Sequence, residues 1–216
     1  RLSSAPWQAW RLWLPPLLPL LAIAIVATAL PALMQSALPL DLVRGGLARQ
    51  GLPEGSGALL IGVQLGLLLL LQWPVGRALA RRPVATGLGL SLVSFVLGCL
   101  LLAASALLSR GGMVALVLAQ LPLALGEAAF LPTATEAVVE LTPPDHQGLA
   151  MALFSQCFAI SSLVAPPLAG QLLDRQGHGV GLWLLVALVC LLTLPLLAPL
   201  QAGVRQRSGP SAQGRG

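Results

Sequence analysis

The sequence predicts an all-α membrane protein with six transmembrane helices, arranged as two inverted units of three helices each. Of its residues, 56% are hydrophobic and only 9% are charged, whereas a soluble domain has about 25% charged residues. The mean hydropathy is +0.87. Charged residues divide the chain into long apolar runs, and a short pattern recurs in two of them. A soluble fold of this length has too little interior to bury so much apolar surface.

Each apolar run is long enough to cross a bilayer, which takes about 20 helical residues at about 1.5 Å per residue. Between them lie short segments with Gly, Pro and Arg, of which residues 44–57 form the longest surface loop. We therefore predict helices at residues 14–40, 58–79, 84–108, 113–141, 148–173 and 179–200.

The two ends of the chain are expected outside this 14–200 bundle. Residues 1–13 form a cytoplasmic or interfacial segment, because Trp7, Trp10 and Trp13 recur every three residues with Arg11 among them, in the manner of an interfacial anchor. Residues 201–216 are rich in Gly, Ser, Gln and Arg and are predicted to be a disordered cytoplasmic tail.

Arginine positions predict the orientation, because the more basic loops of a membrane protein face the cytoplasm. Every basic residue is an arginine. One side of the predicted topology holds Arg1, Arg11, Arg77, Arg81, Arg82, Arg205, Arg207 and Arg215; the other holds Arg44, Arg49, Arg110 and Arg175. We expect a multi-pass protein of the plasma or inner membrane with both termini in the cytoplasm. The arginines lie at the ends of apolar runs rather than in one patch, so nucleic acid is not an expected partner.

No residue pattern indicates an enzyme, a metal site or a cofactor. The cysteines Cys99, Cys157 and Cys190 lie singly within apolar runs, where they are expected to pack like small apolar residues. His146 and His178 lie in loops without ligand spacing. Membrane-embedded catalysis needs clustered polar residues within the spans, and none are apparent.

An internal repeat supports the inverted arrangement. The pattern G-x-x-L-x-R ends the second run at residues 76–81 and the fifth run at residues 170–175. A unit with an odd number of spans must be inverted in its second copy. Inverted repeats are typical of secondary transporters, whose sites lie near the midplane where the repeats meet.

Residues 126–156 resemble the fourth or tenth helix, the following loop and the next helix of the major facilitator superfamily, with Gln147 where that family usually has Arg. A second segment is similar to its g-x-x-x-G-P-x-x-G-G signature, through Ser161, Ala165, Pro166, Ala169 and Gly170. Small residues at this spacing allow helices to approach closely.

Residues 76–83 resemble a decayed form of the family's G-x-L-a-D-R-x-G-R-R loop. Gly76 and Arg81 match, whereas Ala80 replaces the Asp. This decay favours the carboxy-terminal half of the family's fold, helices seven to twelve. The resemblance implies a six-helix bundle that pairs with the other six-helix half of the same polypeptide around a central cavity.

Glu127 is the leading candidate for a substrate-binding or proton-coupling residue. It lies in the middle of the fourth run, where an ionised side chain costs about 2.5–3.5 kcal/mol. The alternative is a protonated Glu hydrogen-bonded to a neighbouring helix. Gln35 and Gln120 are further candidates, because the resemblance places their helices at the cavity. Conformational roles are expected for the matched residues Gly76, Arg81, Ser161, Ala165, Pro166 and Gly170.

Together these features predict a secondary active transporter of a small solute, working by alternating access, with the proton as candidate coupling ion. Its expected partners are the solute, the lipid bilayer and the other six-helix half. The alternative is a non-transporting scaffold or assembly factor built on the same fold.

Overall fold

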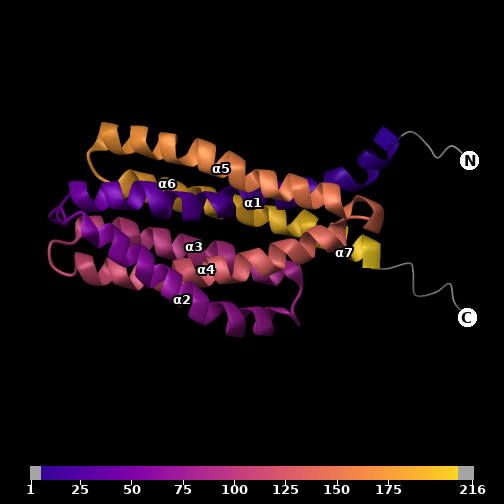
Figure 1. The fold of residues 1–216 in the computed structure, drawn as a ribbon, viewed down its shortest axis with the longest axis horizontal. Coiled ribbons are helices and arrows are strands. Elements are labelled where there is room, and N and C mark those ends of the chain that lie inside the picture. The colour runs from indigo at the N-terminus through magenta and orange to yellow at the C-terminus, as the bar shows by residue number, and fades with distance from the viewer. Residues whose placement is uncertain (1–5, 209–216) are drawn as a thin grey trace, which may run out of the picture.

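Six long helical segments lie side by side along one axis and form a bundle (Figure 1). This computed structural model describes residues 6–208, and the side chains of residues 13–204. The helices are α1 (Pro6–Arg44), α2 (Gly55–Leu79), α3 (Val84–Leu107), α4 (Gly112–Leu141), α5 (Gln147–Gln176), α6 (Val180–Thr193) and α7 (Leu197–Ser208), with 3₁₀ turns η1 (Pro144–His146) and η2 (Leu194–Leu196). In the described part of the chain, six segments are long and apolar enough to cross a membrane, which confirms the predicted fold class.

Glycine and proline set the helix ends. Gly111 precedes α4 with φ of 94°, and Gly177 follows α5 with φ of 73°; both angles are left-handed and favour glycine. The N–H of Gly177 donates to the carbonyl of Leu173 and closes the last turn of α5. Pro83 precedes α3 in an extended conformation, so it separates α3 from the basic turn after α2.

Helix α7 corrects the prediction of a disordered tail from residue 201. The chain is helical as far as Ser208, while residues 209–216 lie outside the described part. Leu200 is fully buried, and Gly203 lies against Leu141 and Pro16. This packing against α1, α3 and α4 stabilises a segment whose composition alone predicts disorder. Pro195 lies between α6 and α7, where its missing N–H interrupts the α-helical hydrogen bonds.

The amino-terminal boundary also differs from the prediction. Helix α1 already begins at Pro6, because proline is well tolerated at the first helical position. Trp13 is fully buried and stacks on His146, with 5.7 Å between ring centroids. Trp13 therefore packs within the bundle at the turn between α4 and α5, and its expected position at the membrane interface stays a prediction. The side chains of Trp7 and Trp10, and all of residues 1–5, lie outside the described part.

The helices pack in a crossed pattern. Helix α5 packs mainly on α1, and α2 mainly on α4. The central helices α1 and α4 run in opposite directions (Figure 1). The triplets are α1–α3 and α4–α6. The second helix of each triplet therefore packs on the first helix of the other, as expected for two inverted three-helix units.

The closest approach between helices lies where the two triplets meet, between α3 and α4. A side chain added at Gly87 would collide with Thr133, one at Gly98 with Leu123, and one at Gly126 with Phe95. Glycine at these positions lets the two helices come together. By contrast, α2 buries only Gly57, Leu60 and Gln64, so most of its surface faces away from the bundle.

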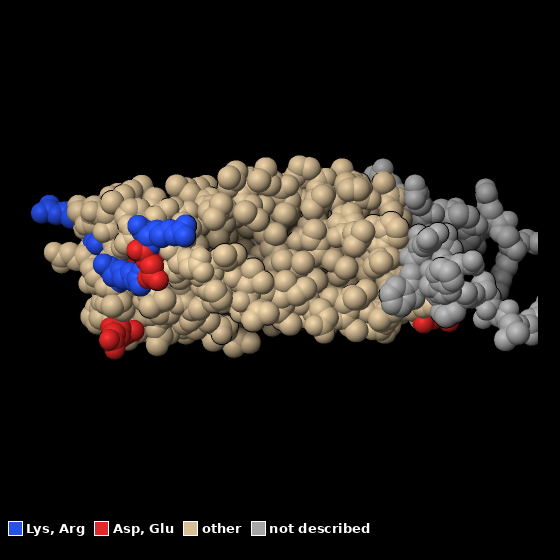
Figure 2. Space-filling view, turned by 90° about the horizontal axis from the view of Figure 1, so that it is seen from above, with Lys and Arg blue, Asp and Glu red and all other residues tan. Residues whose placement is uncertain are grey.

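Charged side chains lie towards the ends of the bundle. Figure 2 shows a face whose middle lacks Lys, Arg, Asp and Glu, with a group of both signs near one end. The start of α1 and the end of α7 lie at the opposite end from the α1–α2 loop (Figure 1). An apolar band between two polar ends is the arrangement that a bilayer requires.

Candidate functional site

Glu127 lies in the middle of α4, about 22 Å along the helix from Gly112 at about 1.5 Å per residue. Its side chain is half-buried. Nε2 of Gln64, a buried residue of α2, donates a hydrogen bond to Oε2 of Glu127 over 3.3 Å. This pair joins the second helix of one triplet to the first helix of the other at the depth where transporter sites lie.

A small pocket surrounds the pair. It has a volume of about 30 Å³ and is lined by Pro31, Met34 and Gln35 of α1, Ile61, Gln64 and Leu65 of α2, and Glu127 of α4. This volume holds about one or two water molecules. Within these six helices the pocket can therefore accept water or a proton, but not a solute.

The structure brings together two of the three predicted polar candidates. Gln35 lines the same pocket as Glu127. Gln120 does not: it is fully buried, and its Nε2 donates to the carbonyl of Leu116 over 2.9 Å.

Gln64, the direct partner of Glu127, is not among the candidates that the sequence singles out. The signal for it is its spacing from Gly57 and Leu60. Positions i, i+3 and i+7 share one face of a helix, and these three residues are the buried face of α2.

Ser161 links α5 to α1. Its hydroxyl donates to the carbonyl of Ile25 over 2.7 Å and lies 2.8 Å from the hydroxyl of Thr28. Ala165 and Pro166 are half-buried on the same helix. The expected close approach does not occur at Gly170, where an added methyl group would meet no atom within 4 Å. In this chain, the signature residues join α5 to α1 mainly through a polar contact.

Gly76 and Arg81 lie at the end of α2 that leads into the basic turn. The carbonyl of Gly76 accepts the N–H of Ala80 over 2.9 Å, and an added methyl group at Gly76 would meet no atom within 4 Å. Arg81 is exposed. Neither residue contacts the pocket at Glu127.

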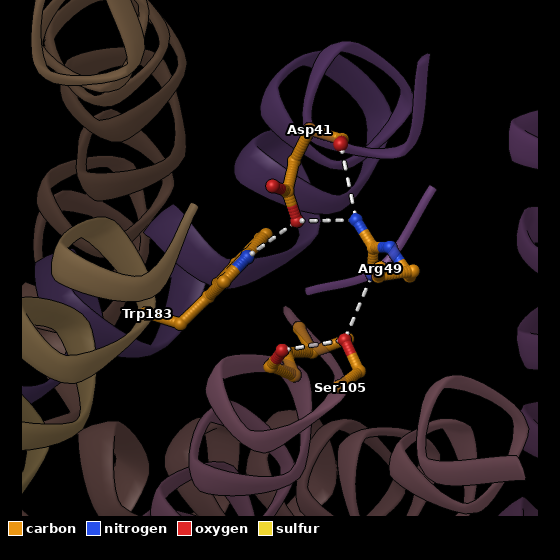
Figure 3. A network of polar contacts seen from close by, with 5 residues as sticks. Asp41, Arg49, Ser105 and Trp183 are labelled. Atoms are coloured by element: carbon orange, nitrogen blue, oxygen red, sulfur yellow. Dashed lines mark hydrogen bonds and ion pairs between the residues drawn. The ribbon is translucent and has the colours of Figure 1, made fainter. Parts of the chain in front are cut away.

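A buried polar cluster lies at the other end of the bundle, and the sequence analysis missed it (Figure 3). Arg49 in the α1–α2 loop donates to Oγ of Ser105 over 2.8 Å and to the carbonyl of Asp41 over 3.0 Å. One of its nitrogens also lies 3.5 Å from the Asp41 carboxylate. Trp183 of α6 donates from its indole nitrogen to the same carboxylate over 3.1 Å. The cluster thus ties the end of α1 to its loop, to α3 and to α6.

Small residues allow this cluster to close. A side chain added at Gly179 would collide with the Asp41 carboxylate, and one at Gly112 would press on the Arg49 side chain. Arg49 is only 6% exposed, so its side chain turns inward although most of its loop is exposed. Asp41 and Arg49 are eight positions apart, and α1 ends between them. A hydropathy pattern does not predict such a contact.

In the described part of the chain, no group of three or more His, Cys, Asp or Glu side chains is placed to hold a metal ion.

Six membrane-length helices, a crossed arrangement of two triplets and a carboxylate at mid-depth define a polytopic membrane protein of the transporter type. The chain belongs to the Major Facilitator Superfamily, whose family pattern matches residues 12–215. It is thus a membrane transporter of that superfamily, and its six spans are consistent with one half of the fold. No curated protein matches the chain.

Proposed function

We propose that the chain forms one half of a secondary active transporter, which moves a small solute by alternating access and exchanges a proton at Glu127. The observation that carries this proposal is the contact of the Glu127 carboxylate with Gln64 in a water-sized pocket at mid-depth. A carboxyl group at this depth is costly to ionise without a partner, and Gln64 supplies one.

The amide of Gln64 suits both protonation states of the acid. Its NH₂ group donates to the ionised carboxylate, and its carbonyl oxygen can accept from the protonated acid. Glu127 can therefore lose and regain a proton without losing its contact with α2. The small pocket volume favours a proton rather than a solute as the species handled by this pair.

The solute cavity then needs a second set of helices. Helices α2 and α5 present large apolar side chains away from the bundle; Leu70 of α2 is 74% exposed and Leu163 of α5 is 75% exposed. These faces suit the other six-helix half of the same polypeptide, so that the solute lies between the two halves. From the arginine count we infer that both termini lie in the cytoplasm.

Transport in proteoliposomes tests the role of Glu127. The solute is first identified by the increase that candidate compounds cause in the thermal stability of the purified protein. For Glu127→Gln we expect solute exchange without a pH gradient to persist, while uphill accumulation driven by a pH gradient is lost. The control is Glu136→Gln, which alters an exposed acid of the same helix and should retain both activities. Gradient-driven accumulation by Glu127→Gln would show that this carboxylate does not carry the proton.

The same assay tests the alternative of a non-transporting scaffold. A scaffold predicts no stabilising solute and no uptake by the wild-type protein. Gradient-driven uptake by the wild type excludes the scaffold even if Glu127→Gln behaves normally.

A further inference from the structure

Three arginines gather at the end of α2 that lies on the same side of the bundle as the start of α1 and the end of α7 (Figure 1). Trp73 and Arg77 are four residues apart, so they are neighbours along one row of the helix. Arg81 and Arg82 follow in the turn after α2, which ends at Leu79. Together with Pro74 and Ala78 they line an open concavity of about 590 Å³. The guanidinium of Arg77 lies over the Trp73 ring, 5.5 Å from its centroid.

These arginines have no acidic partner in the described part of the chain. The ion pairs found there, Arg44–Asp174 and Arg49–Asp41, both lie at the opposite end of the bundle. Ala80 stands where the resembled loop has an Asp. Three exposed guanidinium groups on adjacent turns repel one another, so an anion held between them relieves this repulsion.

The surface next to the arginines is strongly apolar. Leu65 and Leu69 continue the same row of α2 and are 53% and 73% exposed, and Trp73 is 71% exposed. An indole between an apolar surface and a basic one is typical of the boundary between hydrocarbon and head groups. Along α2 the order is therefore Leu65 and Leu69, then Trp73, then the arginines. This order matches the hydrocarbon chains, the interface and the charged head group of an anionic phospholipid.

We propose that Trp73, Arg77, Arg81 and Arg82 bind the head group of an anionic phospholipid, with its hydrocarbon along Leu65 and Leu69. Guanidinium groups bind phosphate oxygens in pairs, and basic residues beside a transmembrane helix attract anionic lipids. Because the sequence predicts this end of the bundle to be cytoplasmic, the lipid belongs to the inner leaflet.

Native mass spectrometry of the purified protein with phosphatidylglycerol and phosphatidylcholine tests this site. We expect the wild-type protein to retain phosphatidylglycerol preferentially. The double variant Arg77→Gln/Arg81→Gln should bind it about 25-fold more weakly, about five-fold for each arginine removed. The matched control is Arg110→Gln/Arg175→Gln, which removes two exposed arginines at the opposite end and should bind as the wild type does.

A charge-conserving variant separates lipid binding from a folding defect. Arg77→Lys/Arg81→Lys keeps both charges but loses paired hydrogen bonding, so we expect affinity between those of the wild type and the Gln variant. Several results overturn the proposal: equal retention of the two lipids, equal losses in the Gln variant and its control, or displacement of the lipid by millimolar inorganic phosphate, which indicates a site for a soluble anion. Failure of the wild type to retain either lipid also overturns it.

Discussion

Asp41→Asn tests whether the buried polar cluster stabilises the bundle through its charge pair. The substitution keeps the size of the side chain and an oxygen that can accept from Trp183, but it leaves Arg49 as an unpaired cation. The side chains of Arg49 and Asp41 are 4% and 0% exposed, so water cannot replace the lost charge. The cluster has few spare contacts, because Nε of Arg49 and Oδ1 of Asp41 already lack hydrogen-bond partners.

Removing one member of a buried pair costs about 3–5 kcal/mol. Arg49 keeps its bonds to Ser105 and to the Asp41 carbonyl, so we expect a loss of about 3 kcal/mol. For a chain of this size, 1 kcal/mol corresponds to about 2–4 °C in Tm. The Tm should therefore fall by about 6–12 °C. The double variant Asp41→Asn/Arg49→Met removes both charges and should recover most of this loss.

The protein provides its own reporter for the measurement. Its three cysteines, Cys99, Cys157 and Cys190, are all buried and reduced, so a thiol-reactive fluorophore reports unfolding as they become accessible. The control is Arg44→Gln, which breaks the exposed pair with Asp174 and should cost no more than about 1 kcal/mol. The reasoning fails if Asp41→Asn lowers the Tm no more than this control does. It also fails if the double variant loses as much stability as the single variants Asp41→Asn and Arg49→Met lose together.

The remaining predictions concern packing and the Glu127 site. Gly179→Ala overpacks against the buried carboxylate of the cluster and should cost about 1–3 kcal/mol; Gly148→Ala, which meets open space, should leave the Tm unchanged. Ser161→Ala removes the hydroxyl joining α5 to α1 and should cost about 1 kcal/mol, against no change for the exposed Ser162→Ala. Gln64→Leu removes the donor to the mid-depth carboxylate and should shift the pH dependence of gradient-driven uptake; an unchanged profile would separate Gln64 from proton transfer.

The six crossings were predictable because hydropathy and span length are local properties. The runs 58–79 and 113–141 agree with α2 and α4 to within three residues at each end, because Gly, Pro and Arg lie next to the helix ends there. The helical tail was not predictable from composition. It depends on the burial of Leu200 and on the contacts of Gly203 with α1 and α4, which exist only in the folded bundle.

The site shows the same limit. Glu127 is conspicuous in the sequence because charge is rare within a membrane span. Its partner Gln64 is one of several similar glutamines, and only the rotation of α2 against α4 selects it. The Asp41–Arg49 pair requires a loop to fold back across a helix end, which residue spacing alone does not reveal.

The close contact of α3 with α4 has a mechanical consequence. Because it lies between the two triplets, separating them would open voids beside Gly87, Gly98 and Gly126, and packed interiors resist such voids. For the proposed transport cycle we therefore expect the α3–α4 contact to persist, with large displacements at the exposed faces of α2 and α5, where few residues are buried.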